Sequence, residues 1–325
     1  MAANPDNSAD KRFLIQLLGL SVATLLFTLG VVYYFMNGND PIEKVVRDNS
    51  VWQPPSLASL GHSSTDSMIH YGRELVVNTA LYLGPKGKVK HISNGMNCQN
   101  CHLEAGTKPF GNNYSMVAST YPKYRERSGT VEGVYKRIND CIERSLNGKA
   151  LDTTSHEMQA LQAYILWLGK DVKKGQKVAG AGITTLAYMP RAASPAAGKP
   201  VYELKCQSCH RATGNGVLNS DSASYQYPPL WGAHSYNIGA GLYRLSRLAG
   251  YIKSNMPNGT CYDKPVLTTD EAWDVAAYIN AQPRPTMNIS HDWKRIASKP
   301  IDHPFGPYTD TFSEARHKYG PYTGM

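Results

Sequence analysis

Two short motifs hold the residue types that can do the most chemistry in this chain of 325 residues. Each has the spacing C-x-x-C-H: the first comprises Cys98, Cys101 and His102, and the second comprises Cys206, Cys209 and His210. At this spacing the two thiols attach to haem vinyl groups and the histidine ligates the iron. A zinc site would need further Cys or His pairs, and a thioredoxin-like redox pair would need a βαβ setting. The two motifs therefore predict two covalently bound haem c groups.

The second iron has one strong candidate for its sixth ligand. Met256, in the sequence Asn-Met-Pro, lies just before the last helix expected in this half of the chain. Pro228 begins a Pro-Pro-Leu stretch whose carbonyl can steady the His210 imidazole. His/Met ligation raises the potential of a haem, which suits an electron exit. The sequence therefore predicts that His210 and Met256 hold an electron-transfer haem.

The sixth ligand of the first iron is less obvious. The candidates that follow the first motif are Met116, Cys141, His156 and Met158. Cys141 and Cys261 are the two cysteines outside the motifs, and two such residues in an oxidising compartment often form a disulfide. Cys141 therefore either pairs with Cys261 or ligates the first iron.

The neighbours of Cys141 favour the ligand. Arg137 and Arg144 bracket it at helical spacing and would favour its thiolate, and Ser145 adds a hydroxyl one turn on. Further cations near it in the sequence are Arg125, Arg127, Lys136 and Lys149. A thiolate ligand lowers the haem potential relative to methionine. A cationic pocket beside a sulfur-ligated iron indicates a small anionic sulfur compound as substrate.

The elements that must position these residues follow a plan that occurs twice. In the first half, the apolar spacing predicts helices over 66–83, 131–145 and 156–168, the last with Ser155 as its N-cap. In the second half, it predicts helices over 200–205 and 241–253, and one that begins after Thr268 or Thr269. Two copies of helix, haem motif, loop, ligand and terminal helix amount to an internal repeat.

The predicted fold class is mainly α, with two class I cytochrome c-like haem domains in tandem. The expected segments are a cytoplasmic N-terminus at 1–12, a transmembrane anchor at 13–36, a tether at 37–64, the first haem domain at 65–170, a linker at 171–196, the second haem domain at 197–283 and a C-terminal tail at 284–325. The tail is rich in proline and aromatic residues. We expect it to pack on the domains as an extended segment, because a disordered tail would carry fewer aromatic side chains.

The segment 13–36 contains no charged residue and is long enough to cross a hydrocarbon core of about 30 Å as a helix. Lys11 and Arg12 precede it, which predicts a cytoplasmic N-terminus and a translocated body. A cleaved signal peptide is the alternative, but no small-x-small site follows Met36. We therefore predict a single-pass protein of the cytoplasmic (inner) membrane, with its haem domains on the periplasmic side.

The chain is basic, with a formal net charge of +9 at pH 7 and a sequence pI near 9.1. This charge suits anionic partners in general. No run of Lys and Arg with interleaved aromatic residues stands out, so the sequence predicts no nucleic-acid partner.

The segment from Cys98 to Ala150, with CQNCHLEAG and RINDCIERSLNGK, resembles the dihaem thiosulfate dehydrogenases, which form tetrathionate. The resemblance continues through stretches that begin at Trp231, Ser235, Asn255, Glu271 and Asp302, so it covers nearly everything after residue 60. It implies an active-site haem ligated by His102 and Cys141 and an electron-exit haem ligated by His210 and Met256. It also implies that Arg127, Arg137 and Ser145 surround the cysteine at the active site.

Two features depart from that family pattern. The predicted membrane helix is not typical of the soluble members. Some members have a lysine that competes with methionine at the second haem, but 237–247 contains none and Lys253 lies too close to Met256 to fill that role comfortably.

Two functions follow as hypotheses. The first is an enzyme that couples two thiosulfates to tetrathionate, or performs the reverse, with Cys141, Arg127, Arg137, Arg144 and Ser145 at the active site. Its electron acceptor would be a cytochrome c or a membrane oxidase. The second is a membrane-anchored dihaem electron-transfer cytochrome with no substrate chemistry, and a subunit of a larger respiratory complex is a third reading.

Overall fold

The computed structural model describes residues 15–29, 51–221 and 223–325. The helices of the main body are α2 (Ser64–Val77), α3 (Thr79–Leu83), α4 (Leu103–Gly106), α5 (Val117–Thr120), α6 (Val134–Arg144), α7 (His156–Leu168), α8 (Pro195–Lys205), α9 (Gln207–His210), α10 (Leu245–Asn255), α11 (Thr269–Ala281) and α12 (Glu314–Tyr319). The 3-10 turns are η1 (Leu57–Ser59), η2 (Cys98–Asn100), η3 (Gly241–Tyr243) and η4 (Ile296–Ser298). The strands β1 (Lys123–Arg125) and β2 (Thr130–Glu132) form one antiparallel hairpin, and β3 (Val217–Leu218) and β4 (Tyr225–Tyr227) form another.

The first helical unit is built on the contact between α2 and α7. α2 begins with a reciprocal cap, in which the Ser63 hydroxyl accepts from the Asp66 amide and the Asp66 carboxylate accepts from the Ser63 amide. Where the helices cross, a Cβ on Gly72 would lie 1.9 Å from the Ala160 carbonyl oxygen. Glycine at this position therefore lets the two backbones touch.

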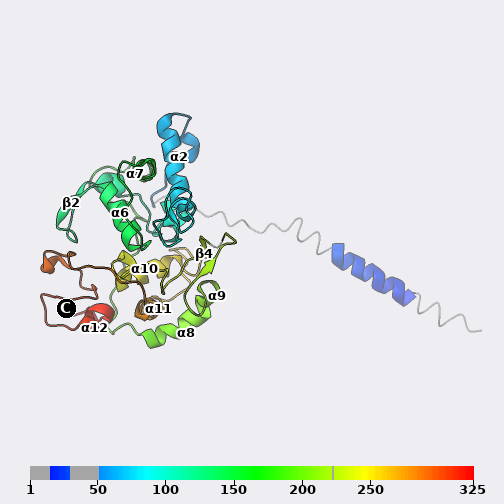
Figure 1. Ribbon diagram of the computed structural model, residues 1–325. Coiled ribbons are helices and arrows are strands. Elements are labelled where there is room, and N and C mark those ends of the chain that lie inside the picture. Colours follow the sequence, from blue (N-terminus) through cyan, green and yellow to red (C-terminus); the bar gives the residue numbers. More distant parts are fainter. Residues whose placement is uncertain (1–14, 30–50, 222) are drawn as a thin grey trace, which may run out of the picture. The chain divides into compact units, whose positions relative to one another are not determined.

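The second unit repeats this crossing with α8 and α11. A Cβ on Gly198 would lie 1.9 Å from the Asp274 carbonyl oxygen, as at the first crossing. Thr268 and Glu271 form the reciprocal cap of α11, so Thr268 is the capping residue of the two threonines that the sequence offers. Figure 1 shows α2, α6 and α7 gathered on one side of the body and α8, α10 and α11 on the other. The internal repeat is therefore a repeat of helix packing.

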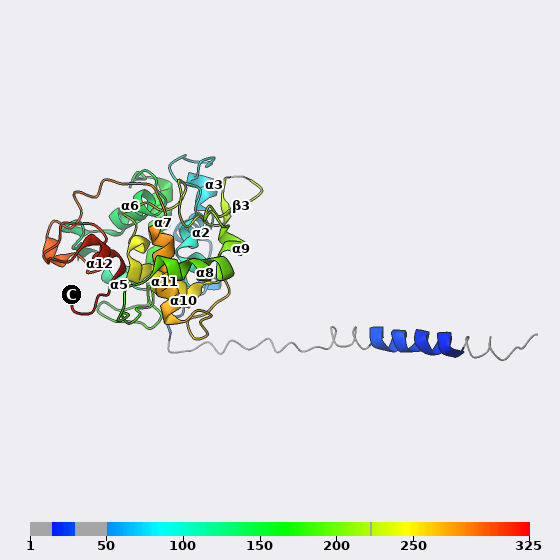
Figure 2. The ribbon, with the colours of Figure 1, turned by 90° about the horizontal axis from the view of Figure 1, so that it is seen from below.

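Each unit has its own buried cluster. The first includes Leu75, Leu161 and Tyr164, and the second includes Tyr202, Leu248 and Trp273. Tyr236 and Tyr243, which belong to the second half of the sequence, are buried in the first cluster. The two units therefore share part of one core, and α8, α10 and α11 remain close together in the second view (Figure 2).

Several elements differ from the predicted bounds. The helix expected over 66–83 is divided at Asn78 into α2 and α3. The helix expected over 131–145 is shorter, because β2 occupies its first residues. The helix expected over 200–205 begins at Pro195 instead. Ser194 accepts a hydrogen bond from the Ala197 amide there, and the fixed φ of a proline suits the first helical position.

The predicted linker is packed against the body. Its buried side chains include Val172, Ile183 and Met189, and isolated bridges join Ala179 to Val51 and Ile183 to Gly111. The C-terminal tail also packs, as its aromatic content predicts, with Trp293, Asp302, His317 and Tyr322 buried.

Residues 15–29, which form a helix with exposed side chains, are the described part of the predicted anchor. The remainder of 13–36, all of 1–12 and the first part of the predicted tether lie outside the described residues. Within the parts that are described, no helix is long and apolar enough to cross a membrane.

Candidate functional site

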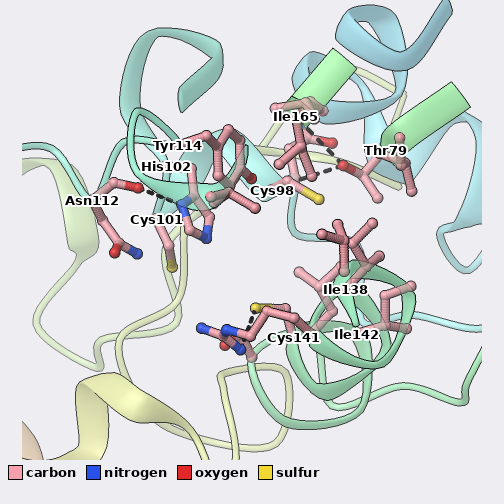
Figure 3. A pocket seen from close by; sticks show the side chains of 18 of the residues that line it. Thr79, Cys98, Cys101, His102, Asn112, Tyr114, Ile138, Cys141, Ile142 and Ile165 are labelled. Carbon is pink, nitrogen blue, oxygen red and sulfur yellow. Dashed lines mark hydrogen bonds between the residues drawn. The ribbon is translucent and has the colours of Figure 1, made fainter. Parts of the chain in front are cut away.

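The first C-x-x-C-H motif and α6 border one open cavity, whose empty space is about 970 Å³ when the solvent at its mouth is included. Cys98, Cys101 and His102 line it, and Cys141 enters it from α6 (Figure 3). The rest of the wall is mostly apolar, with Val76, Leu83, Val117, Ile138, Leu161 and Ile165 among its side chains. The fold therefore brings the first motif and the predicted sixth ligand together.

The His102 ring is fixed by two contacts. Its Nδ1 lies 2.5 Å from the carbonyl oxygen of Asn112, and its face stacks on Tyr114 with the ring centroids 4.4 Å apart. Burial lowers the pKa of His102 to about 4, so the imidazole is neutral. With the Nδ1 proton donated to the carbonyl, Nε2 keeps its lone pair, as a metal-binding histidine requires.

Cys141 lies one turn after Arg137 on α6, and Arg137 Nη1 donates a hydrogen bond to the Cys141 sulfur at 3.1 Å. The nearby sulfur raises the pKa of Arg137 and outweighs the opposing effect of burial, so the guanidinium stays charged. Ser145, one turn further on, also lines the cavity. Three of the predicted site residues are therefore on one stretch of α6 and its C-cap.

The other candidates for the sixth position do not line this cavity. Met158 is fully buried in the helical core, and His156 is exposed and stacks on Tyr71. Met116 is not among the lining residues either. Cys141 and Cys261 are both free thiols, and Cys261 is exposed, so the disulfide alternative is not present.

Arg127 and Arg144 lie together around a carboxylate of the tail. Asp292 accepts two hydrogen bonds from Arg144, at 2.7 and 2.8 Å, and lies 4.0 Å from Arg127 Nε. The Trp293 amide donates to the Arg127 carbonyl at 2.7 Å, and the Trp293 ring lies under the guanidinium. Burial and the charge of Arg144 lower the pKa of Arg127 to about 10, and Arg137 adds to this repulsion.

The structure therefore separates the predicted arginines into two groups. Arg137 lines the cavity, whereas Arg127 and Arg144 are held at Asp292, and Arg144 already has a forked carboxylate partner. The sequence alone does not identify Asp292 or Trp293 as part of this neighbourhood. No local signal identifies them, because they follow Arg144 by more than 140 residues in an irregular segment.

The second motif borders a larger open cavity, whose empty space is about 1790 Å³ when the solvent at its mouth is included. Cys206, Cys209, His210 and Met256 all line it. The His210 Nδ1 lies 2.8 Å from the Pro228 carbonyl oxygen, which confirms the expected role of that carbonyl. The pKa of His210 is lowered by burial, so this imidazole is also neutral.

The two cavities share a wall. Cys101, from the first motif, lines both of them. Tyr251 of α10 donates a hydrogen bond to the Asn100 carbonyl at 3.0 Å. Lys253 lies on the same helix, but its amino group donates to the Leu267 carbonyl.

The residues present fit a covalently attached haem in each cavity. Each cavity offers two thiols, a neutral imidazole whose Nδ1 is occupied, and a sulfur-containing side chain that also lines it. Each also has apolar walls and enough space for a large planar group. The first sulfur is the thiol of Cys141 and the second is the thioether of Met256.

Two family models match the chain. The model described as the SoxA/TsdA cytochrome c domain matches residues 88–173, and the cytochrome c model matches residues 195–283. Each match contains one of the C-x-x-C-H motifs. The chain therefore has two cytochrome c domains in tandem and two covalently bound c-type haems.

Several known proteins are similar over most of the chain. Thiosulfate dehydrogenase from Allochromatium vinosum is 37% identical over 235 residues, which are 71% of this chain and 83% of the relative. Those from Stutzerimonas stutzeri and Thiomonas intermedia are 35% and 33% identical, over 73% and 82% of this chain and 74% and 82% of the relatives. The solved structure of thiosulfate dehydrogenase (TsdBA) from Marichromatium purpuratum, in its as-isolated form, matches with a TM-score of 0.67 and 33% identity. That match covers 74% of this chain and 50% of the other, so this chain matches half of that longer protein.

Proposed function

The chain belongs to the thiosulfate dehydrogenase family, and we propose that it couples two thiosulfate ions to tetrathionate at the first haem site. One observation carries this proposal. The Cys141 sulfur shares a cavity with His102 and accepts a hydrogen bond from Arg137. In this proposal His102 and Cys141 hold the active-site iron, and His210 and Met256 hold the electron-exit iron.

The main physical obstacle is the charge of the substrate. Two thiosulfate dianions about 5 Å apart repel each other by roughly 13 kcal/mol at an effective dielectric constant near 20. Arg137 lies at the cavity, and Arg127 is close enough to Arg137 for their charges to interact. Guanidinium groups bind oxyanions through forked hydrogen bonds, so these two arginines would offset the repulsion. Ser145 would orient one sulfonate with its hydroxyl.

Arg144 has a more indirect place in this proposal. Its two terminal nitrogens both donate to Asp292, so its donors face the tail carboxylate. Since Asp292 is shared by Arg144 and Arg127, one positive charge of the pair remains uncompensated. Arg144 would therefore contribute to anion binding indirectly, through the net positive charge of Arg127, Arg144 and Asp292 and by holding Asp292 in place.

Cys141 would be a labile ligand whose released thiolate acts as the nucleophile, because a thiolate beside a guanidinium is an activated sulfur. Its sulfur bonds to the terminal sulfur of one thiosulfate as two electrons leave the pair. The second thiosulfate then attacks that terminal sulfur, which forms tetrathionate and returns the Cys141 thiolate. When bound, the two haems supply one-electron acceptors for this chemistry. The same residues would serve the reverse reduction of tetrathionate.

The second site would pass the electrons to an external protein, a cytochrome c or a membrane oxidase. His/Met ligation gives the higher potential that an exit requires. The shared wall at Cys101 supports transfer from the first site to the second. An electron carrier without substrate chemistry is the alternative, and the free state of Cys141 and Cys261 gives it no support.

Cys141→Ser tests the proposed function. We expect thiosulfate oxidation to fall by at least about 1000-fold, because the nucleophile is removed. We also expect the low-spin thiolate signal in the electron paramagnetic resonance spectrum to disappear. Cys261→Ser is the matched control, since it removes an exposed thiol, and both properties should be unchanged. Full turnover in Cys141→Ser would refute the mechanism, and a wild-type spectrum without a thiolate signal would favour the carrier.

We further propose that the N-terminal segment 13–36 attaches the protein to the cytoplasmic membrane, with the haem domains on the periplasmic side. The uncharged sequence and the preceding Lys11 and Arg12 support this. In fractionated cells the full chain should sediment with membranes and require detergent for release. Recovery of the full chain in the soluble fraction would contradict the proposal.

A further inference from the structure

The segment that leads through β1 turns every second side chain toward the body. Tyr121, Lys123 and Arg125 are half-buried. The intervening Pro122 and Tyr124 are exposed. This alternation is the two-residue period of an extended chain. Because Tyr121 lines the first cavity, the half-buried side of the segment adjoins the proposed substrate site.

Lys123 is a cation without a nearby carboxylate. Its Nζ lies 5.3 Å from the ring centre of Tyr121. Glu132 is opposite Lys123 in the hairpin, but its carboxylate is buried and lies 3.9 Å from Arg125 Nε. Across residues 51–221 and 223–325, no carboxylate lies within ion-pair distance of Lys123. Burial lowers the pKa of Lys123, and the charges of Arg125 and Arg137 lower it further, so an anion would relieve this repulsion.

The Tyr121 hydroxyl is a second polar group on this side that the mechanism does not use. Burial raises the pKa of Tyr121, and the charge of Arg137 opposes this effect, so the hydroxyl keeps its proton within electrostatic range of that guanidinium. Within the described body, neither this hydroxyl nor the Lys123 ammonium has a hydrogen-bond partner, and neither is among the polar atoms that are fully shielded from solvent. Both groups are therefore accessible to an anion from solution.

We propose that Tyr121, Lys123 and Arg137 form an outer anion subsite at the first cavity, which binds the sulfonate of the second thiosulfate. This inference rests on the proposed function, in which one thiosulfate is held at Cys141 and a second must approach it. The ammonium is a compact charge on a flexible stem, and the phenol donates one hydrogen bond. Together they bind a dianion near the first one while adding positive charge that offsets the repulsion between the two.

Sulfate tests this subsite without turnover, because it is a dianion of similar shape that is not oxidised. Isothermal titration calorimetry of the oxidised holoprotein at low ionic strength gives the half-saturating sulfate concentration. Lys123→Met should raise it about 5- to 10-fold, between the effect of losing an exposed ion pair and that of losing a hydrogen bond to a buried charge. Tyr121→Phe should raise it about threefold. Lys123→Arg should retain most of the affinity, since it keeps the charge.

Two matched controls separate these effects from general ones. Tyr124→Phe removes a hydroxyl from the opposite face of the same strand, where the side chain is 53% exposed. Lys149→Met removes an exposed cation elsewhere in the first unit. Each should leave the half-saturating sulfate concentration within a factor of about two of the wild type.

An unchanged sulfate affinity in both Lys123→Met and Tyr121→Phe would overturn the proposal. If the first-haem potential shifts in these variants while the sulfate affinity does not, the two side chains bind a haem carboxylate instead of a substrate. If Lys123→Met does not retain both haems, Tyr121→Phe carries the test, because it keeps the ring that lines the cavity.

Steady-state kinetics connect the subsite to turnover. Lys123→Met should raise KM for thiosulfate about 5- to 10-fold and leave kcat within a factor of about two, as expected for a group that binds substrate and transition state equally. A wild-type protein that does not oxidise thiosulfate would refute the proposed function, whereas the sulfate titration would still decide whether the anion subsite exists.

Discussion

Replacing Arg137 by methionine removes the guanidinium that donates to the Cys141 sulfur across 3.1 Å. Methionine retains much of the apolar length of the side chain, so the cavity wall stays filled. A hydrogen bond to a charged group contributes about 1.5–3 kcal/mol. At 1.36 kcal/mol for each factor of ten, its loss lowers kcat/KM for thiosulfate by roughly 10- to 150-fold. Because Arg137 would also bind a sulfonate, we expect a higher KM and a lower kcat together.

The assay is thiosulfate-dependent reduction of a one-electron dye by purified holoprotein, with haem content measured for each sample. Lys149→Met is the matched control, since it removes an exposed cation from the same stretch of sequence. Its kcat/KM should stay within a factor of about two, because exposed charges of this kind contribute little. If Arg137→Met with a full haem complement keeps kcat/KM within about threefold of the wild type, the guanidinium is not part of the site.

Three further predictions concern stability. Asp292→Asn leaves Arg144 without its carboxylate and should lower the free energy of unfolding by about 3 kcal/mol in urea titrations. In a protein that already carries Arg144→Met, the same substitution should cost much less. Thr268→Ala removes the cap of α11 and should cost about 1 kcal/mol, measured the same way. Burial lowers the pKa of His303 to about 4. As the pH falls, His303 therefore becomes protonated in the unfolded chain at a higher pH than in the folded chain. From pH 7 to pH 5 the wild type should therefore lose about 2 kcal/mol more stability than His303→Phe, and an equal loss would refute this assignment.

The features that the sequence predicted correctly are those encoded by adjacent residues. Ser155 caps α7 as expected, because a cap depends on residues within one turn. The motif spacing placed Cys98, Cys101 and His102 in one cavity for the same reason. Helical spacing also predicted that Arg137 lies beside Cys141, and the two side chains are hydrogen-bonded one turn apart on α6.

The features that the sequence missed depend on distant segments. Helical spacing predicted Arg144 near Cys141. The long Arg144 side chain instead extends to Asp292, a distant residue in the sequence, and donates two hydrogen bonds to it. The sequence predicts a linker up to residue 196, because Ala, Gly and Pro dominate that stretch. In the structure α8 already begins at Pro195, and Gly198 on this helix permits its close crossing with α11.

The contacts between the two units bear on how electrons would cross the molecule. Lys108, which follows the first motif, donates to the Thr260 carbonyl at 2.9 Å. Asn255, which precedes Met256, donates to the Phe110 carbonyl at 3.1 Å, and Tyr251 donates to Asn100. Each of these bonds joins a segment beside one haem site to a segment beside the other. Separation of the two units would therefore break hydrogen bonds beside both sites.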